Sequence, residues 1–189
     1  MKDKSQNLSP EAELIFRKVM FKGDSNEIFN HGVSDDTMVF FIKVANDTIE
    51  VFLSKYPQIK DSFSVNEFDK FKSLMYEAVG LGFHIFYAEK VYLKKDDHFS
   101  KHSGSKFLEY LDKEFNGYFV TESKNPDEIT PSYIVEVAKQ LAFTLFNEGI
   151  IKSELTKKKL PQEFIDSSLM QIIWLILMGY DLSVLQEEY

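Results

Sequence analysis

Apolar residues recur every three or four positions along most of this chain, which is typical of amphipathic α-helices. The clearest stripe consists of Met38, Phe41, Ile42, Ala45, Ile49, Phe52, Leu53 and Tyr56. Pro57 follows this stripe, and proline is not tolerated in the interior of a helix. The pattern therefore predicts a helix over about residues 38–56.

A longer apolar segment begins after a capping box. Ser64 and Glu67 stand three residues apart, so each side chain can satisfy a backbone N–H of the other residue at a helix start. The apolar residues that follow cover nearly all sides of the predicted helix, which extends to about Leu93. Because such a helix packs between other elements, residues 65–93 are expected to form the long central helix of the fold.

Three further helices begin at a proline and end at a glycine. They are predicted over residues 10–23, 131–149 and 161–179, and the tail after 179 is expected to add one turn. Residues 107–115 predict one shorter helix, whereas the extended stretch at 118–121 is too short for a sheet. The fold class predicted is all-α, a compact bundle of about six helices.

The length of 189 residues favours a single helical domain over residues 1–189. Residues 35–93 and 130–179 share a similar order of apolar positions; for example, Ile42-Lys43-Val44-Ala45 resembles Val135-Glu136-Val137-Ala138. Two interpretations stay open. The segments are two related helical hairpins, or they match because apolar residues at helical spacing align by chance.

Gly80 and Gly82 interrupt the predicted central helix, where each glycine costs about 1 kcal/mol relative to alanine. They allow close helix contact, mark a kink, or open a small pocket beside His84. Close packing is the favoured interpretation, since glycines inside helices usually have packing causes. A buried histidine usually stabilises the core, so the alternative, a ligand pocket lined by Gly80, Gly82 and His84, ranks second.

His98 and His102 stand four residues apart, beside two aspartates, and would bind zinc if this segment were helical. The neighbouring Ser103-Gly104-Ser105 and several lysines favour a solvated loop. Accidental spacing is therefore the better explanation for this candidate metal pair.

Composition excludes several classes of function. The chain has no cysteine, which excludes disulfides and thiolate metal sites and fits a cytoplasmic location. The formal net charge is -8, and Arg17 is the only arginine among 22 basic residues, so direct nucleic-acid binding is not expected. The longest apolar run, residues 169–178, spans about 15 Å as a helix, half of the roughly 30 Å bilayer core, so no membrane span is expected.

Motifs for phosphate, dinucleotide, di-iron, zinc-protease and serine-hydrolase chemistry do not occur in the sequence, so neither an enzyme nor a bound cofactor is predicted. The favoured function is that of a non-enzymatic protein-binding module: an inhibitor, an immunity or anti-defence factor, or an adaptor. Its partner would be another protein, with a basic surface if charge guides binding. Phe99, Tyr118 and Phe119 are candidate partner-binding anchors. The alternative is a small-molecule-binding or metal-binding regulatory domain that uses the pocket near Gly80.

Overall fold

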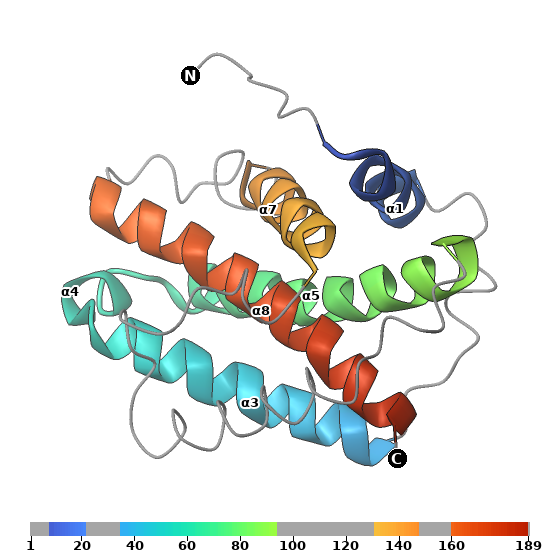
Figure 1. The fold of residues 1–189 in the computed structure, drawn as a ribbon. Coiled ribbons are helices and arrows are strands. Elements are labelled where there is room, and N and C mark those ends of the chain that lie inside the picture. The colour runs from blue at the N-terminus through green and yellow to red at the C-terminus, as the bar shows by residue number, and fades with distance from the viewer. Residues whose placement is uncertain (1–7, 22–34, 94–130, 148–159, 189) are drawn as a thin grey trace.

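The computed structural model describes residues 8–21, 35–93, 131–147 and 160–188, and within them the protein is an all-α bundle (Figure 1). The α-helices are α1 (Pro10–Phe21), α3 (Asp35–Ser54), α4 (Pro57–Lys60), α5 (Val65–Ala88), α7 (Ser132–Phe146) and α8 (Gln162–Glu188). A π-helical turn, η1 (Glu89–Leu93), directly follows α5. The predicted fold class is confirmed.

Local sequence signals explain where several helices begin. Ser64 Oγ accepts a hydrogen bond from the Glu67 amide at 3.3 Å, and the Ser64 amide donates to Glu67 Oε2 at 2.8 Å. The predicted capping box is therefore present. Ser9 caps α1 in the same way, because its Oγ accepts from the Ala12 amide at 3.4 Å. α3 ends at Ser54, and Pro57 opens the short helix α4, which was not predicted.

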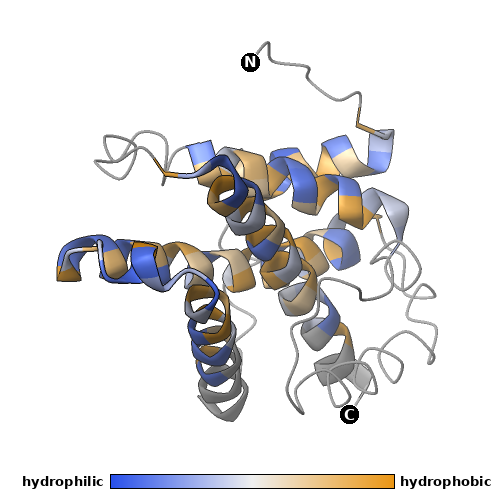
Figure 2. Ribbon diagram, turned by 90° about the vertical axis from the view of Figure 1, so that its left-hand side faces the viewer, coloured by the Kyte–Doolittle hydropathy of each residue, from blue (hydrophilic) through white to orange (hydrophobic). Residues whose placement is uncertain are grey.

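The core is organised around α5 and α8, which run in the same direction and cross each other (Figure 1). A side chain on Gly82 would overlap the backbone of α8, including the carbonyl carbon of Gly179 at 2.7 Å. A side chain on Gly179 would in turn overlap the backbone of Val79. The two glycines thus allow the two longest described helices to touch backbone to backbone. Figure 2 shows hydrophobic residues concentrated where the helices meet.

One predicted helix end is wrong. Gly179 was expected to end the last helix, but α8 continues through it to Glu188, because this glycine serves the crossing with α5 and not a C-cap. The central helix was expected to extend to about Leu93, and the helical segment does reach Leu93: α5 ends at Ala88 and the chain continues to Leu93 as the π-helical turn η1. Gly80 and Gly82 do not break α5, which is continuous through both.

An aromatic cluster joins the ends of α3, α5 and α8 near α4. Its members are Phe52, Tyr56, Phe63, Phe71 and Phe164. The Phe164 ring centroid lies 5.6 Å from that of Phe52 and 5.2 Å from that of Tyr56. Aromatic pairs at such distances contribute about 0.5–1.5 kcal/mol each beyond the area that they bury. Part of the high aromatic content is therefore used to hold these helices together.

The predicted helix at 107–115 and the extended stretch at 118–121 lie outside the described residues. The single domain and the internal repeat stay predictions. Within the described ranges, no helix combines the length and the apolarity that crossing a bilayer requires.

Candidate functional site

The most unusual buried group of the described structure is the carboxylate of Glu89, the first residue of η1. Its exposed fraction is 0%. Glu89 continues a row of buried residues along α5 that includes Ala78, Gly82 and Ile85, at spacings of three and four. Fully buried glutamates are rare unless they are paired, so the partners of this carboxylate decide what it does. A π-helical turn is itself a feature found frequently at functional sites.

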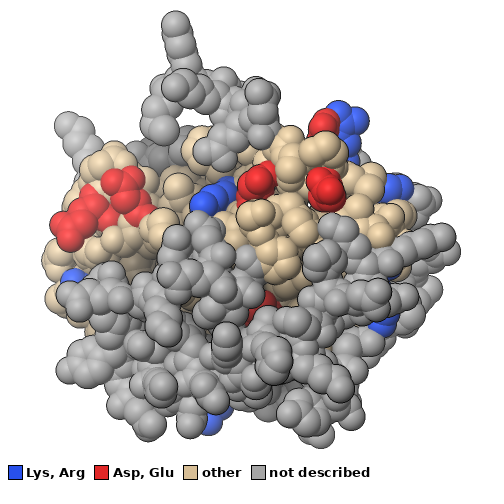
Figure 3. Space-filling model, viewed as in Figure 1, with Lys and Arg blue, Asp and Glu red and all other residues tan. Residues whose placement is uncertain are grey.

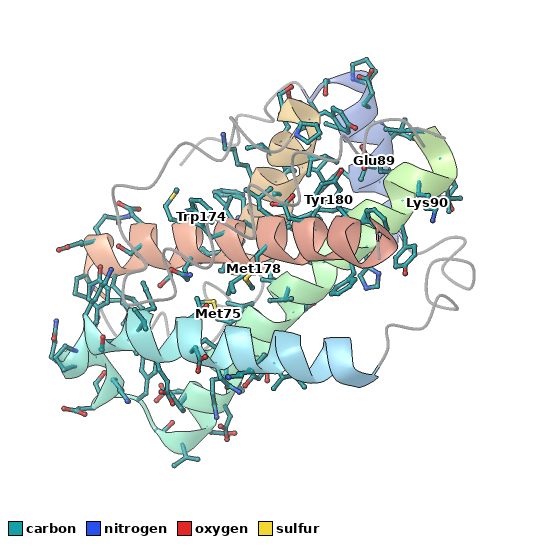
Figure 4. All side chains as sticks on the ribbon, turned by 60° about the horizontal axis from the view of Figure 1, so that its bottom comes forward. Met75, Glu89, Lys90, Trp174, Met178 and Tyr180 are labelled. Atoms are coloured by element: carbon teal, nitrogen blue, oxygen red, sulfur yellow. The ribbon has the colours of Figure 1, made fainter. Side chains whose placement is uncertain are left out.

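Two tyrosines from different helices bind the Glu89 carboxylate. The Tyr133 hydroxyl, on α7, donates to Glu89 Oε1. The Tyr180 hydroxyl, on α8, donates to Glu89 Oε2 at 2.5 Å. Figure 4 shows Tyr180 beside Glu89 where α8 passes the end of α5. Each carboxylate oxygen thus accepts a hydrogen bond from a different helix, and the three side chains join α7 and α8 to the end of α5. We call this group the Glu89 junction.

Both phenols stay protonated. Burial raises the pKa of Tyr180 well above its usual value of 10.0, and the negative charge of Glu89 raises it further. Burial is also the main reason that the pKa of Tyr133 is raised, followed by its hydrogen bond to Glu89. Glu11 on α1 adds to the effect on Tyr133, and Asp181 adds to the effect on Tyr180. Ionisation of either phenol would place like charges together in a buried site.

Among the described residues, no lysine, arginine or histidine forms an ion pair with Glu89. A contact between a cation and an aromatic ring joins α1 to η1: Lys18 Nζ lies 4.3 Å from the centre of the Tyr92 ring. The described part of the chain also contains no group of three or more histidine, aspartate or glutamate side chains placed to hold a metal ion. With both carboxylate oxygens occupied by tyrosines, the arrangement fits the anchoring of three helices.

The structure describes only part of the candidate sites expected from the sequence. His84 is half-buried on α5 and has an interaction partner. A side chain on Gly80 would meet nothing within 4 Å, whereas the backbone of α8 fills the space beside Gly82. Close packing, the favoured interpretation of the glycines, therefore holds for Gly82 and not for Gly80. The histidine pair His98 and His102 and the anchors Phe99, Tyr118 and Phe119 lie outside the described residues.

The Glu89 junction was missed from the sequence. One signal was available, because Glu89 occupies a position in the apolar row of α5 where the helical period requires a buried residue. Tyr133 and Tyr180 carry no comparable signal. Their helices approach Glu89 from separations of 44 and 91 residues, and a single sequence does not indicate such pairings.

The second candidate feature is an outward row along the first half of α8, in which two acidic side chains are followed, at helical spacing, by two apolar side chains. Glu163, Asp166 and Met170 are all exposed, and Met170 has an exposed fraction of 51%. Figure 3 shows acidic side chains gathered over the start of this helix. Trp174, partly buried, lies one turn further along the same row. We call these four residues the α8 row.

Comparisons of the chain with models of protein families, with curated proteins and with solved structures find no match.

Proposed function

We propose that this chain is a non-enzymatic protein-binding module that acts as an inhibitor, an immunity or anti-defence factor, or an adaptor. The observation that carries the proposal is the exposure of Met170, at 51%, in a helical row that also contains two exposed carboxylates. Methionine is flexible and polarisable, and it is used frequently at binding surfaces that adapt to a partner.

Charge indicates the kind of partner. The formal net charge of the chain is -8, and Glu163 and Asp166 bring negative charge to the α8 row itself. Complementary charge speeds association and excludes partners of the wrong sign. The partner that fits best is therefore a protein segment with a basic residue beside an apolar side chain. The apolar side chain would contact Met170, and the basic residue would lie near Asp166.

The buried polar chemistry supports the same proposal indirectly. The Glu89 carboxylate has an exposed fraction of 0%, and both of its oxygens accept hydrogen bonds from tyrosines. This arrangement suits a rigid scaffold that holds α8 in place. A rigid helix is a favourable binding element, because less conformational freedom is lost when a partner binds it.

The experiment is affinity capture with the full chain followed by titration of the purified partner. We expect a stoichiometric protein partner whose affinity falls at least tenfold in Met170→Ala, because a tenfold loss corresponds to about 1.4 kcal/mol and truncation of a central, energetically dominant interface residue costs about 2 kcal/mol or more. Asp166→Lys should weaken binding more at low salt than at high salt. Val65→Ala is the control, because Val65 is 80% exposed at the start of a different helix, α5. The proposal is wrong if no stoichiometric partner is captured, or if its affinity is the same for Met170→Ala and Val65→Ala.

A further inference from the structure

No cationic side chain neutralises the charges of the α8 row within the described structure. α8 contains no lysine, arginine or histidine, and neither Glu163 nor Asp166 forms an ion pair with another described residue. The Asp166 carboxylate accepts a hydrogen bond from the Gln162 side chain at 2.8 Å, but this partner is neutral. The dipole of α8 offsets part of the charge of Glu163, in the first turn, and its effect falls off before Asp166. The row therefore presents negative charge that a binding partner can neutralise.

The charge and the apolar surface of the α8 row are separated along the helix. Glu163 and Asp166 lie at its N-terminal end. Met170, which is 51% exposed, follows by one turn, and Trp174, partly buried, follows by another. A molecule that matches the row must therefore be basic at one end and apolar at the other.

The spacing of the row fits an α-helix better than an extended strand. Trp174 lies eleven residues after Glu163, so the row is about 16 Å long at 1.5 Å per residue. A second helix laid alongside presents one side chain per turn of about 5.4 Å and stays in step over the whole row. On a strand, side chains of one face recur about every 6.6–6.8 Å, so the fourth would lie about 3–4 Å past the end of the row.

A second copy of this chain is a poor occupant of the row. Its own α8 contains no basic residue that could neutralise Glu163 or Asp166. The formal net charge of -8 on each copy also opposes their association. The basic groups are therefore expected from a different protein.

We propose that the α8 row binds a basic amphipathic helix of the partner protein, which lies antiparallel to α8. This inference rests on the protein-binding function proposed above and names the element that the partner uses. Basic side chains are most favourable in the last turn of a helix, where they complement the negative end of its dipole. A helix whose basic last turn lies against Glu163 and Asp166 runs opposite to α8, and its earlier turns then bring apolar side chains to Met170 and Trp174. The partner helix would carry two apolar residues four positions apart, followed four and seven positions later by lysine or arginine.

The test uses two synthetic peptides of about 16 residues, built on alanine and glutamine and long enough to form a helix. In the first peptide, two leucines four positions apart are followed four and seven positions later by two lysines; the second peptide has the reverse order of residues. Neither contains tryptophan, so the fluorescence of Trp174, the only tryptophan of the chain, reports binding at the row. We expect the full chain to bind the first peptide about tenfold more tightly, or better, than the second. Equal affinities, a preference for the second peptide, or binding of neither would overturn the inference.

A charge exchange identifies which residues meet. Asp166→Lys should weaken binding of the first peptide, and replacing its first lysine with glutamate should restore binding to this variant. Glu77→Lys is the matched control, because it makes the same change of charge at an exposed position on α5 and should leave the affinity nearly unchanged. Circular dichroism checks that both variants are folded, and Met170→Ala, which changes no charge, should weaken the first peptide as well. Failure of the exchanged peptide to restore binding, or an equal effect of Glu77→Lys, would contradict the proposed arrangement.

Two further outcomes separate this inference from the proposed function. If a captured partner depends on Met170 but binds through a strand or through a helix parallel to α8, the inference is wrong and the proposed function stands. Sedimentation of the chain alone tests the second copy as occupant, and we expect no self-association. A dimer that dissociates in Met170→Ala would assign the row to a second copy and overturn the inference.

Discussion

Removal of one hydroxyl from the Glu89 junction should destabilise the protein far more than removal of a similar hydroxyl elsewhere. Tyr180→Phe keeps the ring, whose centroid lies 6.1 Å from that of Phe86, and removes only the donor to Glu89 Oε2. The acceptor is a carboxylate with an exposed fraction of 0%, so no bulk water replaces the lost bond. A hydrogen bond to a charged group contributes about 1.5–3 kcal/mol, and the free energy of unfolding should fall by about this amount.

The measurement is urea unfolding followed by circular dichroism and by the fluorescence of Trp174, the only tryptophan. For a chain of this length, 1 kcal/mol changes the melting temperature by about 2–4 °C, so a decrease of about 3–12 °C is expected. Tyr76→Phe is the matched control. The Tyr76 hydroxyl donates to the neutral amide of Asn46 in a half-buried position, where the cost should be only about 0.5–1.5 kcal/mol. A cost for Tyr180→Phe that does not exceed that of Tyr76→Phe would refute the reasoning.

The same reasoning predicts that the cost comes from the unpaired carboxylate and not from the missing hydroxyl. Glu89→Leu combined with Tyr133→Phe and Tyr180→Phe replaces the whole Glu89 junction with apolar side chains. Replacement of an entire buried polar group is often neutral or stabilising, whereas removal of one member is costly. The triple variant should therefore be more stable than Tyr180→Phe alone. If it is less stable, the destabilisation has another cause, such as lost packing.

Two further predictions concern pH and the helix crossing. The folded-state pKa values of Tyr133 and Tyr180 are raised above the ordinary value of 10.0, so the unfolded chain loses these protons first. The contribution of the two protonated phenols to the free energy of unfolding is complete below pH 10 and decreases as the pH rises above it. The urea midpoint should therefore fall between pH 9 and pH 11, and it should fall less in Tyr180→Phe than in the unmodified protein. At the crossing, Gly82→Ala should lower the free energy of unfolding by about 1–3 kcal/mol, because its methyl group overlaps the backbone of α8. A methyl group on Gly80 meets open space, so Gly80→Ala should raise the free energy of unfolding by up to about 1 kcal/mol. Equal effects of the two substitutions in urea unfolding would contradict the conclusion that Gly82, and not Gly80, lies at the helix crossing.

The features that could be predicted from the sequence are those fixed by neighbours within a few residues. The capping box of Ser64 and Glu67 depends only on local backbone geometry, and it is present as expected. The stop before Pro57 is local in the same sense. Apolar periodicity identified α5 as a helix enclosed by others, because the pattern itself shows how many sides must be buried.

The wrong predictions concern residues whose roles depend on distant partners. Gly179 resembles a C-cap when only its neighbours in the sequence are considered, but its surroundings are set by Val79 and Gly82, about a hundred residues earlier. The role of Glu89, a polar residue, depends on distant partners in the same way. A glutamate near a helix end is usually solvated, and only its pairing with two distant tyrosines makes burial tolerable.

The two halves of α8 have different structural roles. In the second half, Gly179 and Tyr180 are committed to α5 and to the Glu89 junction, so substitution there should act through stability. In the first half, Phe164 fixes the inner side of the helix in the aromatic cluster, while Asp166 and Met170 remain exposed on its outer side. A helix held at both ends in this way can lose exposed side chains without losing its position. Substitutions in the α8 row should therefore change partner affinity while leaving the free energy of unfolding nearly unchanged, which is the combination expected of a binding surface and not of a packing surface.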